Sequence, residues 1–177
     1  MIRRFYSALV LVALSALTGC STVSDLVTTN IPNGHQGKTK IVVNLRKQTA
    51  SLYKGKVEVA ESRISTGREG HDTPVGRFSV SRKDEDHRSS IYGDYVDRSG
   101  RVVIANVDVR KTAQPAHAHF VGSPMPYFVE FMPGYGLHAG YLPGYAASHG
   151  CVRMPFWKAR QFYNAAKLDT PIVIKNG

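Results

Sequence analysis

The amino-acid sequence predicts a mainly β domain of the α+β class, with a single helix near its end. Short runs rich in β-branched residues recur from Lys40 onward, separated by glycine, proline and asparagine turn signals. No apolar repeat of helical period interrupts these runs before Pro155. The 177 residues are enough for about one domain whose core needs no disulfide. We therefore expect one domain over residues 40–177.

The expected strands fall into an early and a late group. The early strands are expected at residues 40–45, 50–53, 57–66 and 76–81, with a glycine-centred turn at 54–56. The late strands are expected at residues 102–109, 125–131, 134–138 and 172–174. The charged run at residues 82–88 is expected to be a solvated loop. The early strands are short and have no helical period between them, which favours mainly antiparallel pairing.

Pro155 starts the only helix that the sequence predicts, since proline is tolerated in the first turn of a helix. An apolar stripe at helical spacing supports it: Phe156, Ala159, Phe162, Tyr163 and Ala166. Residues 169–171 are expected to end the helix. Its position suggests that it braces the segment that precedes it.

The first 19 residues have the pattern of a secretory signal peptide. Arg3 and Arg4 precede an apolar run that is too short to span a membrane, and small residues then lead into Cys20. This ending resembles the cleavage box of bacterial lipoproteins, in which the cysteine is lipidated. The alternative is an ordinary signal peptide with an incidental cysteine. We expect a leader at residues 1–19, and a lipidated cysteine with a flexible tether at residues 20–39.

The charge of the chain restricts its partners. The formal net charge is +10, and removal of residues 1–19 lowers it to +8 because Arg3 and Arg4 leave with no acid. Such a surplus suits an anionic cell-wall or membrane surface, and export argues against nucleic acid. The alternative is a merely soluble basic surface, because the charges are spread along the chain. Ser21 and Thr22 after Cys20 resemble the sorting signal of Gram-negative outer-membrane lipoproteins, so we expect a lipid-anchored protein facing the periplasm.

The segment 148–153 combines a cysteine with groups that can activate it. Cys151 becomes a nucleophile only as a thiolate, and His138 and His149 are the candidate bases. Gly150 permits a tight turn, in which the amides of Gly150 and Cys151 could face an oxyanion. Arg153 alternates with Cys151 and offers a fixed cation to a carboxylate. The alternatives are a buried, inert cysteine and a surface ion pair of Arg153.

Ser148-His149-Gly150-Cys151-Val152-Arg153, preceded by His138 in a glycine-rich turn, resembles the active-site signature of the L,D-transpeptidase (YkuD-type) catalytic domain. Residues 41–45, the Ser65-Thr66-Gly67 turn and Thr73-Pro74-Val75-Gly76-Arg77-Phe78 resemble the same family, in the same order. The resemblance covers most of the chain from about Lys40 to Lys175. It implies a β-sandwich of mixed sheets with one bracing C-terminal helix.

The resemblance also implies acyl transfer on peptidoglycan stem tetrapeptides. It makes Cys151 the nucleophile, His138 the general base and the Ala139 backbone carbonyl the group that orients His138. His149 would be a secondary histidine that raises the local positive potential, and Gly150 an oxyanion amide. The acceptor could be an amine of a second stem, a lysine of a protein, or water. Two alternatives are a thiol L,D-carboxypeptidase or amidase of murein, and a catalytically silent wall-binding lipoprotein.

Three residues are assigned to substrate binding: Arg153, Ser148 and Tyr127. The Tyr127 hydroxyl could reach an oxyanion or the substrate, whereas the alternative for a tyrosine in an aromatic strand is core packing. The segment of nine residues between His138 and Ser148 is shorter than in many family members. Its two Gly-Tyr pairs, at 140–141 and 144–145, could reshape the acceptor side of the groove.

No metal or cofactor is expected. His117 and His119 alternate and could bind zinc with Asp108 or His87, but this ligand set is incomplete. A loop that lines the substrate groove is the preferred interpretation of residues 116–119. The expected partners are peptidoglycan stem peptides and, through a lipid on Cys20, a membrane. We expect no nucleic-acid partner and a monomeric protein.

Overall fold

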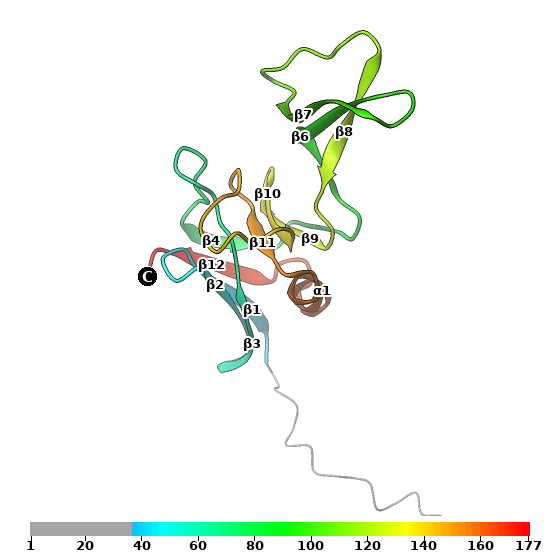
Figure 1. Cartoon of the computed structure of the whole chain (residues 1–177). Helices are drawn as coiled ribbons and strands as arrows, with labels where there is room; N and C mark the ends of the chain where they lie inside the picture. The colour runs from blue at the N-terminus through cyan, green and yellow to red at the C-terminus, as the bar shows by residue number, and fades with distance from the viewer. Residues whose placement is uncertain (1–36) are drawn as a thin grey trace, which may run out of the picture. The chain divides into compact units, whose positions relative to one another are not determined.

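A computed structural model describes residues 37–177, which form three β-sheets and one helix (Figure 1). The expected leader, the Cys20 lipidation site and most of the tether lie outside the described residues. The first sheet has the strand order β3-β2-β1-β12-β4. Its strands are β1 (Thr39–Asn44), β2 (Thr49–Lys54), β3 (Val57–Arg63), β4 (Gly76–Ser79) and β12 (Pro171–Lys175).

The second sheet carries the strands that matter most for function. Its order is β11-β10-β9-β5, with the strands β5 (Arg82–Asp84), β9 (Phe128–Met132), β10 (Tyr135–Ala139) and β11 (Val152–Met154). The β10–β11 pair is parallel, as is the β1–β12 pair of the first sheet, and the other pairs in these two sheets are antiparallel. A mainly β fold with mixed sheets is therefore confirmed, and the antiparallel expectation holds for most pairs.

The third sheet is an insertion between β5 and β9, which pair with each other in the second sheet. Its order is β7-β6-β8, with the strands β6 (Arg88–Asp97), β7 (Val102–Asp108) and β8 (Ala118–Pro124). In Figure 1 it is the green hairpin-rich segment that carries these three labels. A small cluster of buried residues holds it together: Tyr95, Val107 and Ala118.

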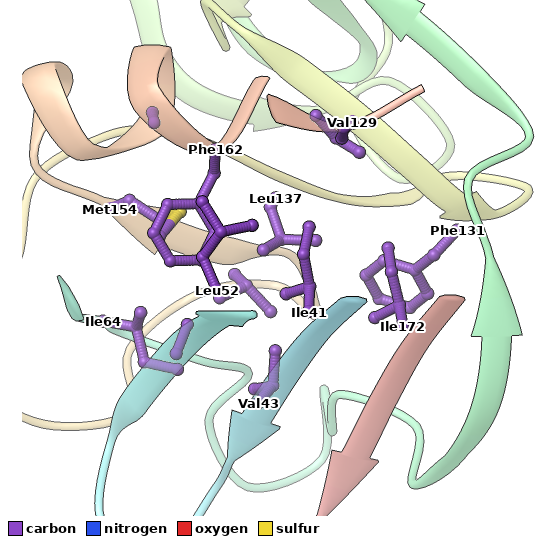
Figure 2. Close-up of a cluster of buried hydrophobic side chains, with 14 of the residues drawn as sticks. Ile41, Val43, Leu52, Ile64, Val129, Phe131, Leu137, Met154, Phe162 and Ile172 are labelled. Atoms are coloured by element: carbon purple, nitrogen blue, oxygen red, sulfur yellow. The ribbon is translucent and has the colours of Figure 1, made fainter. Parts of the chain in front are cut away.

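The main core joins the first two sheets and the helix α1 (Phe156–Ala165). Figure 2 shows side chains from β1, β2 and β12 meeting those from β9, β10 and β11, with Phe162 of α1 beside them. Alternation along each strand sends every second side chain into this core. The predicted helix is present, and it begins directly after Pro155. Among the described residues, no helix is long and apolar enough to span a membrane.

Two loop predictions were wrong. The charged run at residues 82–88 contains β5 and the first residue of β6. Residues of β5 form a strand because β9 supplies their hydrogen-bonding edge, while Arg82 pairs with Glu130 at 3.2 Å. Residues 118 and 119 begin β8, and β6 was not predicted at all. Its polar sequence lacks apolar alternation, and β6 is stabilised instead by pairing with a strand on each side.

The core packing gives a first prediction. Phe162→Ala removes a ring that is 1% exposed, and we expect a loss of about 3–5 kcal/mol in unfolding free energy, because a cavity remains. Phe156→Ala changes the same residue type on the same helix at a position that is 55% exposed, so it should cost less than about 1 kcal/mol. Urea denaturation measures both variants. Equal losses would contradict the assignment of the core.

Candidate active site

The parallel pairing of β10 and β11 gathers the candidate catalytic side chains on one face. The register places His138 opposite Arg153, and neighbours in register point to the same side of a sheet. Cys151 precedes Arg153 by two residues in the same extended segment, so it faces the same way. The alternate residues of both strands are buried in the core on the opposite face: Leu137, Ala139, Val152 and Met154.

These side chains line a cavity of about 490 Å³. His138, Cys151 and Arg153 form part of its wall, together with Ser148 and His149. Residues of β6 and β7 form another part of the wall: Tyr92, Gly93, Asn106 and Val107. The cavity therefore lies where the second sheet meets the inserted third sheet.

His138 is held as a neutral imidazole. Its side chain is buried, and its Nδ1–H donates a 2.8 Å hydrogen bond to the backbone carbonyl of Ala139, the contact that the family resemblance implies. The pKa of His138 is lowered to about 4, mainly by burial and to a lesser extent by Arg153 and His87, while the bond to Ala139 acts in the opposite direction. With Nδ1 as the donor, Nε2 keeps a lone pair that can accept a proton.

Cys151 is a partly exposed free thiol. Burial raises its pKa, although the Gly136 backbone N–H and Arg153 act in the opposite direction. The thiol donates a weak hydrogen bond to the Gly134 carbonyl at 3.6 Å. Because the pKa of the thiol is raised and that of His138 is lowered, the resting pair is a thiol and a neutral imidazole. The proton would then leave the sulfur only during attack.

The structure corrects the expected role of His149 as a source of positive potential. Burial lowers its pKa to about 4, with Arg68 and His71 as further causes, so the ring is neutral. Its Nε2 lies 2.9 Å from Nη2 of Arg68, which can only donate, and its ring stacks on Tyr92 at 4.2 Å. The positive charge that acts on the sulfur comes from Arg153 instead, while Arg68 contacts His149 and the Ser148 carbonyl.

Two further assignments are corrected by hydrogen bonds inside the turn. The Gly150 N–H donates to the Ser148 hydroxyl oxygen at 3.0 Å, so this amide is not available to an oxyanion. The same hydroxyl donates to the Cys151 backbone carbonyl. Ser148 borders the cavity, but its O–H and one of its two acceptor lone pairs are used inside the turn, so its hydroxyl has no free donor for a substrate.

Arg153 is the half-buried cation that the sequence predicts. Among residues 37–177 its guanidinium has no carboxylate within salt-bridge distance, and the same holds for Arg68. Two other ionisable side chains of the cavity wall have acidic partners: Arg82 lies beside Glu130, and His87 lies beside Asp84. The cavity thus has unpaired positive charge beside Cys151.

Tyr127 and the paired histidines lie outside the cavity. The Tyr127 ring packs against Phe156 and Tyr163 of the helix, with centroid distances of 5.1 and 5.7 Å, so its assignment to substrate binding is corrected to core packing. His117 and His119 are exposed and do not line the cavity, so the groove-lining interpretation was wrong. Within the described residues, no group of three or more His, Cys, Asp or Glu side chains could hold a metal ion.

The family assignment rests on most of the chain. The sequence matches the YkuD family, described as the L,D-transpeptidase catalytic domain, over residues 38–174. The chain belongs to this family. No curated protein matches the chain.

Solved L,D-transpeptidases share the YkuD fold. The enzyme from Stackebrandtia nassauensis is 18% identical, with 78% of this chain and 55% of that chain covered and a TM-score of 0.57. A mutant enzyme from Enterococcus faecium is 23% identical, with 79% and 50% covered and a TM-score of 0.58. LdtMt1 in complex with imipenem is 15% identical, with 77% and 58% covered and a TM-score of 0.58. The chain spans 50–58% of the length of these proteins.

Three residues of this YkuD site were not predicted from sequence. Thr73 accepts a hydrogen bond from Gly67 and donates one to Gly150, and its place in the Thr-Pro segment of the family signature could have indicated it. Arg68 and Tyr92 hold His149 from two sides. Neither carried a sequence signal, because both are distant in the chain from residues 148–153 and become neighbours only in the fold.

The raised thiol pKa gives a second prediction. In a Cys20→Ser variant Cys151 is the only thiol that iodoacetamide can alkylate. The rate of this alkylation should still increase with pH above pH 9, because the Cys151 pKa is raised from the ordinary 9.0. Free cysteine, measured in parallel, should level off earlier. A rate plateau at neutral pH would reveal a thiolate–imidazolium pair and contradict the neutral resting pair.

Proposed function

We propose that the chain is a cysteine-dependent L,D-transpeptidase that acts on peptidoglycan stem tetrapeptides. The observation that carries this proposal is that Cys151, His138 and Arg153 share one face of the β10–β11 pair and line one cavity. A nucleophile, a neutral base and an unpaired cation in one cavity are the groups that acyl transfer on an anionic peptide requires. Membership of the YkuD family supports the same reaction.

The reaction begins with proton transfer from the Cys151 thiol to Nε2 of His138. The sulfur attacks the carbonyl carbon of the amide between the third residue and the terminal D-alanine, and the carbonyl π electrons move to oxygen. Collapse of this intermediate breaks the C–N bond, and the proton returns from His138 to the departing amine of D-alanine. An acceptor amine then attacks the thioester and gives a proton to His138, the C–S bond breaks, and the same proton passes from His138 to the sulfur and restores the thiol.

The charges in the cavity orient the substrate. The terminal carboxylate of the stem would bind the guanidinium of Arg153, with Arg68 adding positive potential nearby. Both arginines lack an acidic partner among the described residues, so a substrate carboxylate would neutralise charge that is otherwise uncompensated. Arg82 and Glu130 already neutralise each other, so they offer less attraction to an anion.

Export and lipid attachment complete the proposal. Residues 1–19 would direct the chain out of the cytoplasm, and Cys20 would carry a lipid that anchors it at the periplasmic face of the cell envelope, in the outer membrane. Residues 20–39 would tether the catalytic domain to that membrane. The support is the sequence of these residues, together with the surplus of Lys and Arg over Asp and Glu, 23 against 13.

The decisive experiment follows defined muropeptides by mass spectrometry. The wild-type chain should release D-alanine from a tetrapeptide stem and join the stem to an added amine acceptor, while Cys151→Ser should do neither, because serine lacks the thiolate. Cys20→Ser is the matched control and should retain activity in solution. Release of D-alanine without any cross-link would identify a carboxypeptidase. Binding without release would identify a silent wall-binding protein.

His138 gives a prediction on rate and pH. His138→Ala should slow acylation of Cys151 by imipenem about 10²–10⁴-fold at neutral pH, the usual contribution of a general base. His117→Ala, an exposed histidine outside the cavity, should have no effect. Wild-type acylation should be constant over the neutral range and should fall as pH drops through about 4, where His138 becomes protonated. An acid limb at the ordinary histidine pKa, or a larger loss in His149→Ala, would contradict His138 as the base.

A further inference from the structure

Thr73 belongs to the Thr-Pro segment of the family signature, to which the proposed reaction gives no role. Its side chain is 3% exposed and makes two hydrogen bonds across the chain. The hydroxyl oxygen accepts from the Gly67 N–H at 2.9 Å, and the hydroxyl donates to the Gly150 carbonyl at 2.7 Å. Thr73 thus connects the 65–73 turn directly to the residue before the nucleophile.

The Gly150 backbone is fixed at both of its polar groups. Thr73 holds its carbonyl, and the Ser148 hydroxyl holds its N–H at 3.0 Å. Its φ of +118° is disfavoured for other residues, and a Cβ at this position would lie 2.5 Å from Cε1 of Tyr135. The turn can therefore adopt this conformation only with glycine, and Thr73 selects the direction of the Gly150 carbonyl within it.

The direction of that carbonyl determines the direction of the next amide. The peptide bond between Gly150 and Cys151 is planar and trans, so its C=O and N–H point in opposite directions. Because the carbonyl points to the buried Thr73, the Cys151 N–H points away from Thr73. Among the described residues this N–H has no hydrogen-bond acceptor. It is thus an unpartnered donor on the residue that carries the sulfur, and a backbone N–H of this kind is the group that an oxyanion binds.

Thr73 itself is rigidly placed. A Cβ on Gly67 would lie 2.0 Å from the carbonyl oxygen of His71, so the two ends of this turn are in close contact. The neighbouring Thr66 is held by the Gln48 side chain, which accepts from its N–H at 3.0 Å and donates to its hydroxyl at 2.7 Å. The Thr66 carbonyl in turn accepts from the N–H of Ser148 at 2.9 Å. The hydroxyl of Thr73 is therefore anchored on a fixed frame.

We propose that Thr73 is a positioning residue that aims the Cys151 N–H at the oxyanion formed during acylation. The inference rests on the proposed function and deepens it. When the sulfur bonds to the substrate carbonyl carbon, the π electrons become a charge on oxygen, and the Cys151 N–H donates to that oxygen until the C–N bond breaks. Without the Thr73 hydroxyl, the Gly150 carbonyl loses the group that fixes its direction, so the Gly150–Cys151 peptide can tilt and the donor is aimed less well.

The test compares two reactions of the same thiol in Thr73→Val. Acylation by imipenem passes through an oxyanion, whereas alkylation by iodoacetamide displaces iodide at a saturated carbon and forms none. Thr73→Val should slow acylation about 10–100-fold, which is no more than the rate loss usually seen when one oxyanion donor is removed. The rate of alkylation should stay within about twofold of wild type. With muropeptides, kcat should fall while KM stays within about twofold.

Matched variants separate positioning from structure. Thr73→Ser keeps the hydroxyl and should restore acylation to within about threefold of wild type. Thr170→Val removes a similarly buried hydroxyl that accepts only from the Lys167 N–H, and should leave both reactions unchanged. Circular dichroism monitors folding, and Thr73→Ala takes the place of Thr73→Val if valine is not tolerated. All reactions use the Cys20→Ser background, so that Cys151 is the only thiol.

The outcomes are distinct. If the wild-type chain is acylated and Thr73→Val is acylated at the same rate, the role of Thr73 is overturned and the proposed function stays intact. Equal losses of acylation and alkylation also overturn it, because they would show that Thr73 affects the thiol and not the oxyanion donor. Failure of Thr73→Ser to rescue acylation overturns it as well. If the wild-type chain neither reacts with imipenem nor turns over muropeptides, the proposed function itself is wrong.

Discussion

The parallel register of β10 and β11 is the constraint on which the rest of the site depends. β11 has only three residues, yet both of its edges are engaged: β10 pairs with one, and Arg153 exchanges two backbone hydrogen bonds with Ser65 on the other, at 2.9 and 3.0 Å. A slip of one residue in this register would turn Cys151 and Arg153 into the core and Val152 into the cavity. The buried packing of Val152 and Met154 therefore keeps the reactive face outward.

The burial of the site explains why its resting state is uncharged. An ion pair of thiolate and imidazolium would have to give up hydration, whereas a thiol and a neutral imidazole lose much less on burial. The opposite shifts of the Cys151 and His138 pKa values express this preference. Transfer of the thiol proton to His138 becomes favourable when the sulfur bonds to the carbonyl carbon and a hydrogen-bond donor stabilises the oxyanion. Arg153 lowers both the thiol pKa and the His138 pKa, so its charge favours the deprotonated form of each group: the thiolate of Cys151 and the neutral imidazole of His138.

The sequence predicted the strands and the helix whose spacing of apolar residues matches the burial of those residues in the fold. The strands of the first sheet and the helix have apolar residues at the spacing that burial demands, and the motif around Cys151 was recognisable from its chemistry. β6 and β5 escaped prediction because pairing on neighbouring strands, not side-chain pattern, stabilises them. The roles of Ser148 and Gly150 were misassigned because sequence shows which groups can donate, but not which are already engaged in the turn.

The inserted third sheet contacts the Cys151 turn through the ring of Tyr92. Tyr92 of β6 stacks on His149 at 4.2 Å, and Arg110 fixes Tyr92 by donating to its hydroxyl at 2.9 Å while pairing with Asp108 at 2.7 Å. The neutral His149 thus serves as a packing surface between the insertion and the Cys151 turn. Residues of β6 and β7 form one part of the cavity wall, whereas His138, Cys151 and Arg153, on and beside the β10–β11 pair, form another. The cavity therefore owes its shape to the insertion as well as to the strands that carry its reactive groups.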